Sequence, residues 1–312
     1  NIIPTNIGLD GKPGAAADGK WYGGVYGWSF SVEVPQDGST AHRNTHYLGL
    51  PGFMNAYLLT GEDSYLDPWR KQIDVINGQK KMIDGKPQYP TMYGDDGWYA
   101  YSPSRYTTGI EEIAYLTMKP SDIDRAPGAW WRNLKDGNTA YAEASLRADL
   151  AQVRRKVLAM RNDTTTPDTR LADDPMKYNP ASVASLVRLA CGGLPTNKQG
   201  LVLHSRLRYF DPIQRRAGLP ADCAALIERL EADTTSVTLV NTNQLEPRTV
   251  TIQAGSYAEH SIELVTTGGK ATAVSGRSFT VTLQPGCGAT LTLKTPRYAK
   301  TPTFAFPWTA RK

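Results

Sequence analysis

The last third of the sequence alternates apolar and polar residues, and this pattern constrains the fold more than any other feature. Between residues 236 and 294, apolar pairs such as Val250 and Ile252, or Leu291 and Leu293, are separated by Thr or Ser. Gly and Pro interrupt the pattern at intervals of roughly 8–12 residues. Strands with one buried and one solvent-facing side have this period of two. The pattern predicts about six strands in a small antiparallel β-sandwich.

The residues before this region carry the spacing of amphipathic helices instead. One predicted helix places Leu66, Trp69, Ile73 and Ile76 on a single face, and the preceding helix begins near Pro51. A turn this short between two helices predicts an antiparallel hairpin. Further helices are predicted at residues 110–116 and 140–161, from Pro180 to Ala190, and from Pro220 to Leu230. The stripe expected on the 140–161 helix consists of Leu146, Leu150, Val153 and Val157.

These patterns predict an α+β multidomain chain. The helical portion is expected over residues 1–234 and the β-sandwich over residues 235–296. Residues 297–312 hold Pro and aromatic side chains, and we expect this C-terminal tail to dock back on the body.

Composition excludes several classes of protein. Hydrophobic residues make up 40% and charged residues 21% of the chain, which indicates a folded protein rather than a disordered one. No apolar run approaches the roughly 20 residues of a membrane span. The net charge of +5 is mild. The basic clusters at residues 154–156 and at Arg206, Arg208, Arg215 and Arg216 are short, so we expect no nucleic-acid partner. They indicate either solvated faces or an anionic partner such as a uronic-acid polymer.

The three cysteines, Cys191, Cys223 and Cys287, show no metal-binding spacing. Buried inert thiols are the favoured interpretation, and a Cys191–Cys223 disulfide stays open as an alternative.

Residues 55–67, NAYLLTGEDSYLD, resemble the helical hairpins of (α/α)-toroid carbohydrate-active enzymes, which include unsaturated glucuronyl hydrolases and toroid polysaccharide lyases. Many such enzymes carry a β-sandwich after the toroid. The resemblance implies an (α/α)-toroid-like N-terminal portion and chemistry on a polysaccharide or oligosaccharide substrate.

Closed toroids use more helices than precede Ser236. Under this resemblance, either a second chain supplies upstream helices or the ring is incomplete. The first residues after Asn1 show no signal-peptide pattern, which is the expectation for a chain whose signal peptide has been removed or for a piece of a longer protein. A secreted or periplasmic location without a membrane partner is nevertheless expected.

The densest polar cluster contains His42, Arg43, Asn44, His46 and Tyr47. Elimination at a uronic acid needs a group that neutralises the carboxylate, a base for the C5 proton and an acid for the leaving oxygen. Arg43 and Asn44 are candidate neutralisers, a histidine is the candidate base, and Tyr47 is the candidate acid. We therefore predict a substrate-binding role for Arg43 and catalytic roles for the other four.

The same cluster has two other interpretations. On a helix, His42 and His46 would share a face at i, i+4, which also suits a divalent metal, but the sequence names no third ligand. No cofactor is therefore predicted. The remaining alternative is a polar helix start whose histidines only cap and hydrogen-bond.

A second cluster combines aromatic and acidic residues, because aromatic faces stack on sugar rings and carboxylates bind hydroxyls. Its predicted substrate-binding members are Trp28, Tyr93, Asp95, Asp96, Trp98, Tyr99, Tyr101, Arg105 and Tyr106. A hydrolase would pair Asp95 or Asp96 with a second carboxylate from Glu111 or Glu112. The alternative is an Asp-Asp-Gly turn with buried aromatics around it.

The sequence thus leaves three functional hypotheses. The first is a polysaccharide lyase that cleaves an acidic, uronate-containing glycan by β-elimination. The second is a glycoside hydrolase with a carboxylate pair. The third is a non-catalytic glycan-binding or scaffold protein. An enzyme is favoured, although fold analogy alone does not establish activity.

Overall fold

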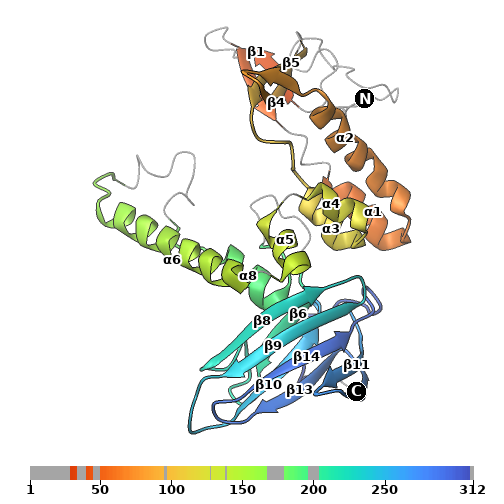
Figure 1. Cartoon of the computed structure of the whole chain (residues 1–312), viewed down its shortest axis with the longest axis vertical. Helices are drawn as coiled ribbons and strands as arrows, with labels where there is room; N and C mark the ends of the chain where they lie inside the picture. The colour runs from red at the N-terminus through yellow and green to blue at the C-terminus, as the bar shows by residue number, and fades with distance from the viewer. Residues whose placement is uncertain are drawn as a thin grey trace. The chain divides into compact units, whose positions relative to one another are not determined.

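The protein is described by a computed structural model, shown in Figure 1. It describes residues 29–33, 40–44, 50–94, 97–126, 128–137, 139–166, 179–195 and 204–309. The chain divides into two compact units, and each is described by itself. Unit 1 comprises residues 1–126 with 197–202, and unit 2 comprises residues 127–196 with 203–312.

Helices form the core of unit 1 where the sequence predicts a helical hairpin. Its described helices are α1 (Leu50–Thr60), the 3₁₀ helix η2 (Asp63–Leu66), α2 (Asp67–Gly78), α3 (Ile110–Thr117) and α4 (Pro120–Arg125). Gly61 ends α1 with a φ of 75°, a left-handed conformation that favours glycine. The predicted apolar face is confirmed, because Leu66, Trp69, Ile73 and Ile76 are each at most 2% exposed.

Unit 1 also contains antiparallel strands, within the portion that the sequence predicts to be mainly helical. Strands β1 (Ser29–Glu33) and β2 (Thr40–Asn44) form one pair. Strands β3 (Lys81–Ile83), β4 (Lys86–Gly94) and β5 (Gly97–Ser102) form a three-stranded sheet. Asp84 and Gly85, with φ of 50° and 72°, make the two-residue turn between β3 and β4. This Asp-Gly pair is a strong local signal for a hairpin.

The (α/α)-toroid prediction is therefore wrong. A toroid needs helical hairpins that succeed one another, but the chain leaves α2 directly into strands β3 to β5 before it returns to α3. Residues 55–67 belong to one helical hairpin, and the elements that follow it along the chain are strands rather than a second helical hairpin. The expectation that a second chain supplies upstream helices followed only from the toroid prediction, so it no longer has support.

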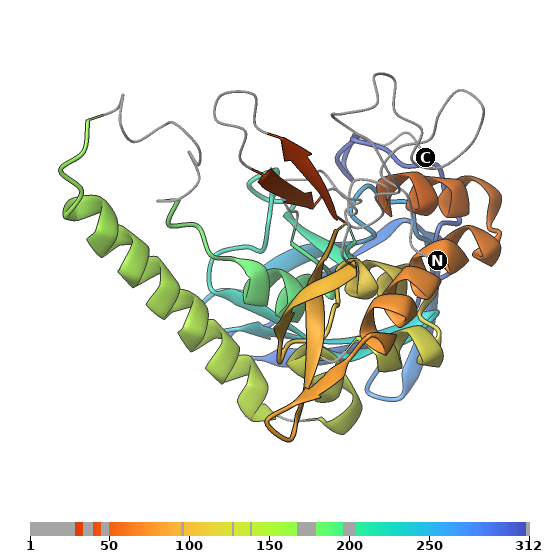
Figure 2. The same ribbon diagram turned by 90° about the horizontal axis from the view of Figure 1, so that it is seen from above.

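Unit 2 begins with helices that pack beside a β-sandwich. They are α5 (Ala129–Asp136), α6 (Thr139–Arg161) and α8 (Ala184–Cys191). The predicted bounds of α6 and α8 are close to those observed, and Gly192 ends α8 with a φ of 59°. Helices α6 and α8 lie side by side (Figure 2), and Ser185 donates its backbone N–H to Asp149 across them. The predicted stripe of α6 is only partly covered, since Leu146 is 37% and Leu150 is 57% exposed.

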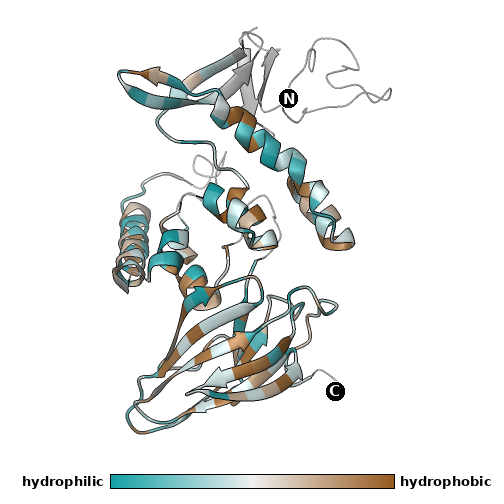
Figure 3. Cartoon of the chain, turned by 45° about the vertical axis from the view of Figure 1, so that its right-hand side comes forward, coloured by the Kyte–Doolittle hydropathy of each residue, from teal (hydrophilic) through white to brown (hydrophobic). Residues whose placement is uncertain are grey.

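The β-sandwich is larger than predicted and begins before residue 235. One antiparallel sheet has the order β13-β10-β6-β7 and the other β12-β11-β14-β9-β8. Hydrophobic and hydrophilic residues alternate along many of these strands (Figure 3), and the core contains side chains from both sheets. The strands are β6 (Leu207–Asp211), β7 (Arg216–Ala217), β8 (Cys223–Leu230), β9 (Thr234–Asn241), β10 (Arg248–Ala254), β11 (Ile262–Thr267), β12 (Lys270–Gly276), β13 (Ser278–Leu283) and β14 (Gly288–Lys294).

The predicted helix from Pro220 to Leu230 is wrong, because these residues form strand β8. Strand β8 pairs with β9 over its whole length, so Ile227 lies opposite Val237. Both side chains are at most 1% exposed. Pairing and burial outweigh the helical preference of the Ala-rich segment.

In the part of the chain that the structure describes, none of the helices is long and apolar enough to cross a bilayer.

Candidate functional site

Three residues of the predicted catalytic cluster lie on strand β2. The two interpretations that place His42 on a helix do not hold, because residues 40–44 form a strand that pairs with β1. The remaining members, His46 and Tyr47, lie outside the described residues, as does Trp28.

The aromatic cluster falls on the β4–β5 hairpin. Tyr93 pairs with Trp98, while Tyr99 and Tyr101 lie further along β5. Lys81 places its ammonium 4.6 Å from the centre of the Tyr101 ring. Asp95 and Asp96, which the hydrolase hypothesis needs, lie outside the described residues.

Strand β1 contacts β4, so the β1–β2 pair and the β4–β5 hairpin lie side by side in unit 1 (Figure 1). The described members of the first cluster thus lie on β2, the partner of β1, and the described aromatic residues 93–101 lie on β4 and β5. Glu111 and Glu112 lie in the first turn of α3.

Tyr106 is removed from the predicted substrate-binding set, because it is only 8% exposed. Its backbone N–H donates to the side chain of Asn77, whose amide donates back to the Tyr106 carbonyl. Burial raises the pKa of the Tyr106 phenol. Its neighbour Arg105 is exposed.

Unit 2 contains a pocket of about 450 Å³ that the sequence analysis did not predict. This volume lies within the range of small-molecule sites, which are largely apolar with a few polar groups. The sheet, the loop after β10 and the end of α8 contribute the lining together with the C-terminal tail. The lining residues are Cys191, Ser205, Leu207, Arg208, Phe210, Ser256, Tyr257, Phe304, Ala305 and Phe306.

Backbone hydrogen bonds hold the tail against the sandwich. Thr303 donates to the Tyr257 carbonyl at 2.8 Å, and Lys300 donates to the Glu259 carbonyl at 3.1 Å. Tyr298 donates its N–H to Nδ1 of His260 at 3.1 Å. The tail is thus fixed close to strand β10 and its loop, which positions its aromatic side chains at the pocket.

Ring contacts connect the tail to the sheet. Phe306 stacks on Trp308 with centroids 5.0 Å apart, and both meet the edge or face of Phe210 at about 6 Å. Tyr257 contacts Phe304 at 5.0 Å. Phe304 is nevertheless 87% exposed, so its ring extends into solvent beside the pocket.

The loop after β10 presents Tyr257 in a fixed conformation. Gly255 has a φ of 88°, and a Cβ there would come within 2.4 Å of the Glu259 carboxyl. Glu259 accepts the backbone N–H groups of Ser256 and Tyr257. Burial raises the pKa of this carboxyl, and the two backbone hydrogen bonds oppose that rise.

Arg208 and Cys191 both line the pocket, and the charge of Arg208 acts on the Cys191 thiol. Arg208 donates from Nη1 to the Ser256 carbonyl at 3.0 Å, and its guanidinium lies 5.0 Å from the centre of the Phe210 ring. Burial raises the pKa of the Cys191 thiol to about 11, although the positive charge of Arg208 opposes this rise. The pocket therefore combines aromatic walls with one cation.

Among the described residues, no group of three or more His, Cys, Asp or Glu side chains is arranged to hold a metal ion. The second pocket of unit 2, of about 380 Å³, contains Arg248, but Asp222 and Glu246 already pair with it.

The comparisons with known proteins find similarity to one family model, whose description names no activity. A family model described as "Domain of unknown function (DUF8034)" matches residues 1–108, roughly the first third of the chain. That stretch is similar to this family and lies in unit 1. No curated protein and no solved structure matches the chain.

The sequence contains partial signals for the pocket. The aromatic tail and the basic residue Arg208 are both visible in it, but Arg208 and Phe304 are separated by almost a hundred residues. Only the docking of the tail on the sheet brings them together.

Proposed function

We propose that this chain binds glycans through the aromatic pocket of its β-sandwich. The observation that carries the proposal is the lining of the pocket, where Phe210, Tyr257, Phe304 and Phe306 surround a space of about 450 Å³. Aromatic faces bury the C–H surfaces of sugar rings, and nearby hydroxyl, carbonyl and guanidinium groups hydrogen-bond to sugar hydroxyls. An exposed ring such as Phe304 marks an interaction surface.

Calorimetric titration of the full chain with a panel of neutral and acidic oligosaccharides tests this proposal. We expect Phe304→Ala to weaken binding about tenfold, the scale of one lost ring contact. Leu245→Ala is the matched control, because Leu245 is also 87% exposed and does not line the pocket. The proposal fails if no oligosaccharide binds, or if the two substitutions have the same effect.

A second candidate function is β-elimination on a uronate-containing glycan at the paired hairpins of unit 1. The contact between β1 and β4 favours it, because it brings the strand of His42 and Asn44 near the aromatic hairpin. In this mechanism Asn44 and Arg43 would neutralise the sugar carboxylate, a histidine would take the C5 proton, and Tyr47 would protonate the glycosidic oxygen as its bond to C4 breaks and the C4–C5 double bond forms. A secreted or periplasmic location accompanies both candidates, because polysaccharides are mostly found outside the cell.

An absorbance assay separates the enzymatic alternatives. A lyase creates a conjugated double bond and a new ultraviolet band, whereas a hydrolase produces reducing ends without that band. Loss of the band in His46→Ala but not in Asp96→Ala would support the lyase, and the reverse pattern for reducing ends would support the hydrolase. If neither product forms on any polymer, the chain only binds.

A further inference from the structure

Arg208 holds a fixed position in the lining of the sandwich pocket. It lies on β6, where its backbone pairs with Gln253 of β10. Its side chain is anchored by the hydrogen bond to the Ser256 carbonyl and by the contact with the Phe210 ring. Because these contacts restrict the side chain, little conformational entropy remains to be lost when a ligand binds.

The charge of Arg208 is not neutralised by an ion pair within the described residues, which distinguishes it from Arg70 and Arg248. Arg70 contacts three carboxylates and Arg248 contacts two. Arg208 makes no ion pair in the described part of the protein, and one of its five N–H donors is used for Ser256. The acid nearest along this loop, Glu259, accepts backbone N–H groups instead.

A half-buried cation beside aromatic walls favours a particular ligand chemistry. A guanidinium presents parallel donors that match the two oxygens of a carboxylate, and such pairs strengthen where water is partly excluded. Phe304, Tyr257 and Phe306 offer apolar surface for the ring that carries this carboxylate. A sugar whose ring bears a carboxylate offers both the apolar ring face for the aromatic walls and the two oxygens for the guanidinium.

We infer that the sandwich pocket binds a carboxylate-bearing sugar and that Arg208 is the residue that selects the charged form. This inference rests on the proposed function, since it assigns the class of glycan to the same pocket. It places an anion-selective site in unit 2, on the sandwich rather than on the hairpins of unit 1.

Trigalacturonate and its fully methyl-esterified form are the probes for this inference, because esterification removes the charges and keeps the rings. We expect the full chain to bind the acid about tenfold to a hundredfold more tightly than the ester, the range of a charge-assisted hydrogen-bonded pair. Arg208→Gln should abolish this preference, because it should weaken binding of the acid far more than binding of the ester. Arg216→Gln, on the neighbouring strand β7, is the matched control and should keep the preference.

A second variant keeps the inference testable if Arg208→Gln does not fold, as judged by circular dichroism. Arg208→Lys retains the charge without the forked donors, so it should retain part of the preference and a wild-type melting temperature. Raising the salt concentration should weaken binding of the acid and not of the ester.

The outcomes separate this inference from the proposed function. Equal affinity for acid and ester, lost in Phe304→Ala, would leave the glycan-binding pocket in place and overturn the role of Arg208. A preference for the acid that survives in Arg208→Gln would also overturn it. Absence of binding to either probe and to the whole oligosaccharide panel would overturn both.

Discussion

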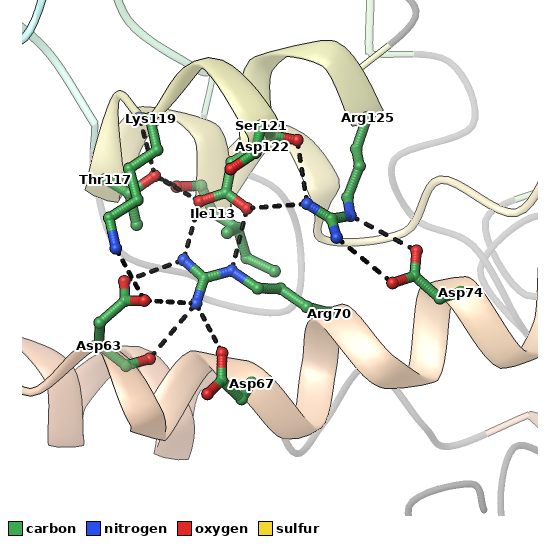
Figure 4. Close-up of polar contacts among 10 residues, drawn as sticks. All are labelled: Asp63, Asp67, Arg70, Asp74, Ile113, Thr117, Lys119, Ser121, Asp122 and Arg125. Atoms are coloured by element: carbon green, nitrogen blue, oxygen red, sulfur yellow. Dashed lines mark hydrogen bonds and ion pairs between the residues drawn. The ribbon is translucent and has the colours of Figure 1, made fainter.

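The guanidinium of Arg70 and the carboxylate of Asp122 form two parallel hydrogen bonds, from Nε to Oδ1 at 2.9 Å and from Nη2 to Oδ2 at 2.8 Å. Figure 4 shows that this pair joins α2 to α4, and that Asp63 and Asp67 contact the same guanidinium. Asp122 also accepts a hydrogen bond from Thr117 at 2.7 Å. Because these charges satisfy one another, we interpret the cluster as structural.

Removal of the cation from this pair should destabilise the protein strongly. The Asp122 side chain is 1% exposed, so Arg70→Met leaves a buried carboxylate without its main partner. We expect the free energy of unfolding to fall by about 3–5 kcal/mol, measured by urea denaturation. Arg147→Met is the control, since its pair with Glu143 on α6 is exposed and should contribute less than about 0.5 kcal/mol. Equal effects of the two substitutions would contradict the structural role of Arg70.

A side chain at position 109 should destabilise the protein, because Gly109 has a left-handed backbone conformation and because neighbouring side chains leave no space for a Cβ. It has a φ of 76°, and a Cβ there would lie 2.4 Å from Leu50 and 2.6 Å from the Trp69 indole nitrogen. Gly85 has a similar φ of 72° with open space around it. We expect Gly85→Ala to cost about 1 kcal/mol from backbone strain alone, and Gly109→Ala about 1–3 kcal/mol more from overpacking. Thermal unfolding of the two variants would show this difference, and similar melting temperatures would contradict it.

Local sequence signals predict several helices, but not α4 or α5, and they predict the strands only in part. The buried face of α2 and the Asp-Gly turn are determined by spacing and turn chemistry within a few residues, whereas Val183 and Leu186 in the predicted 180–190 helix are 50% and 54% exposed. The β8 prediction fails because pairing with β9 and burial of Ile227 decide its structure, and neither is visible in the segment itself. The toroid prediction fails because one hairpin-like motif does not determine whether the next elements are helices or strands.

The candidate pocket could not be predicted, for a related reason. Arg208, Tyr257 and Phe304 come from three separate segments, and each taken alone resembles an ordinary surface residue. Their common location depends on long-range hydrogen bonds of the tail, such as that from Thr303 to Tyr257. Sequence spacing carries no information on such contacts.

Two buried histidines should make the stability of unit 2 depend on pH. Burial lowers the pKa of His204 to about 4 and that of His260 to about 3, and the nearby charges of Arg206 and Arg297 add to both shifts. In the unfolded chain each histidine binds a proton near pH 6.5. The contribution of the two neutral histidines to the free energy of unfolding is therefore fully present above that pH, and it is lost as the pH falls toward 4. The loss should reach about 1.4 kcal/mol per pH unit for each histidine.

His260→Gln tests this dependence, since a glutamine side chain also offers an acceptor for the Tyr298 N–H. The difference in unfolding free energy between wild type and variant should be constant above about pH 7 and should shift in favour of the variant between pH 6 and 4. Urea denaturation at several pH values measures it. A difference that does not change with pH would contradict the buried, neutral state of His260.

The cysteines should differ sharply in their reaction with iodoacetamide at pH 8. Cys287 is exposed, whereas Cys191 is half-buried with a pKa of about 11. Only about one Cys191 thiol in a thousand is ionised at that pH, so its alkylation should be much slower. Mass spectrometry of the digested protein monitors both sites, and it also shows Cys191 and Cys223 as separate free thiols if no disulfide joins them.

Because Cys191 lines the sandwich pocket, its slow alkylation also reports on ligand binding there. Trigalacturonate at saturating concentration should slow the labelling of Cys191 further and leave Cys287 unchanged, since Cys287 is not part of the lining. At a trigalacturonate concentration that only just saturates wild type, Arg208→Gln should show weaker protection, whereas the methyl ester should protect Cys191 in wild type and in the variant at a concentration that saturates both. Protection of Cys287 instead, or of neither thiol at a concentration where calorimetry shows binding, would place the sugar elsewhere on the protein.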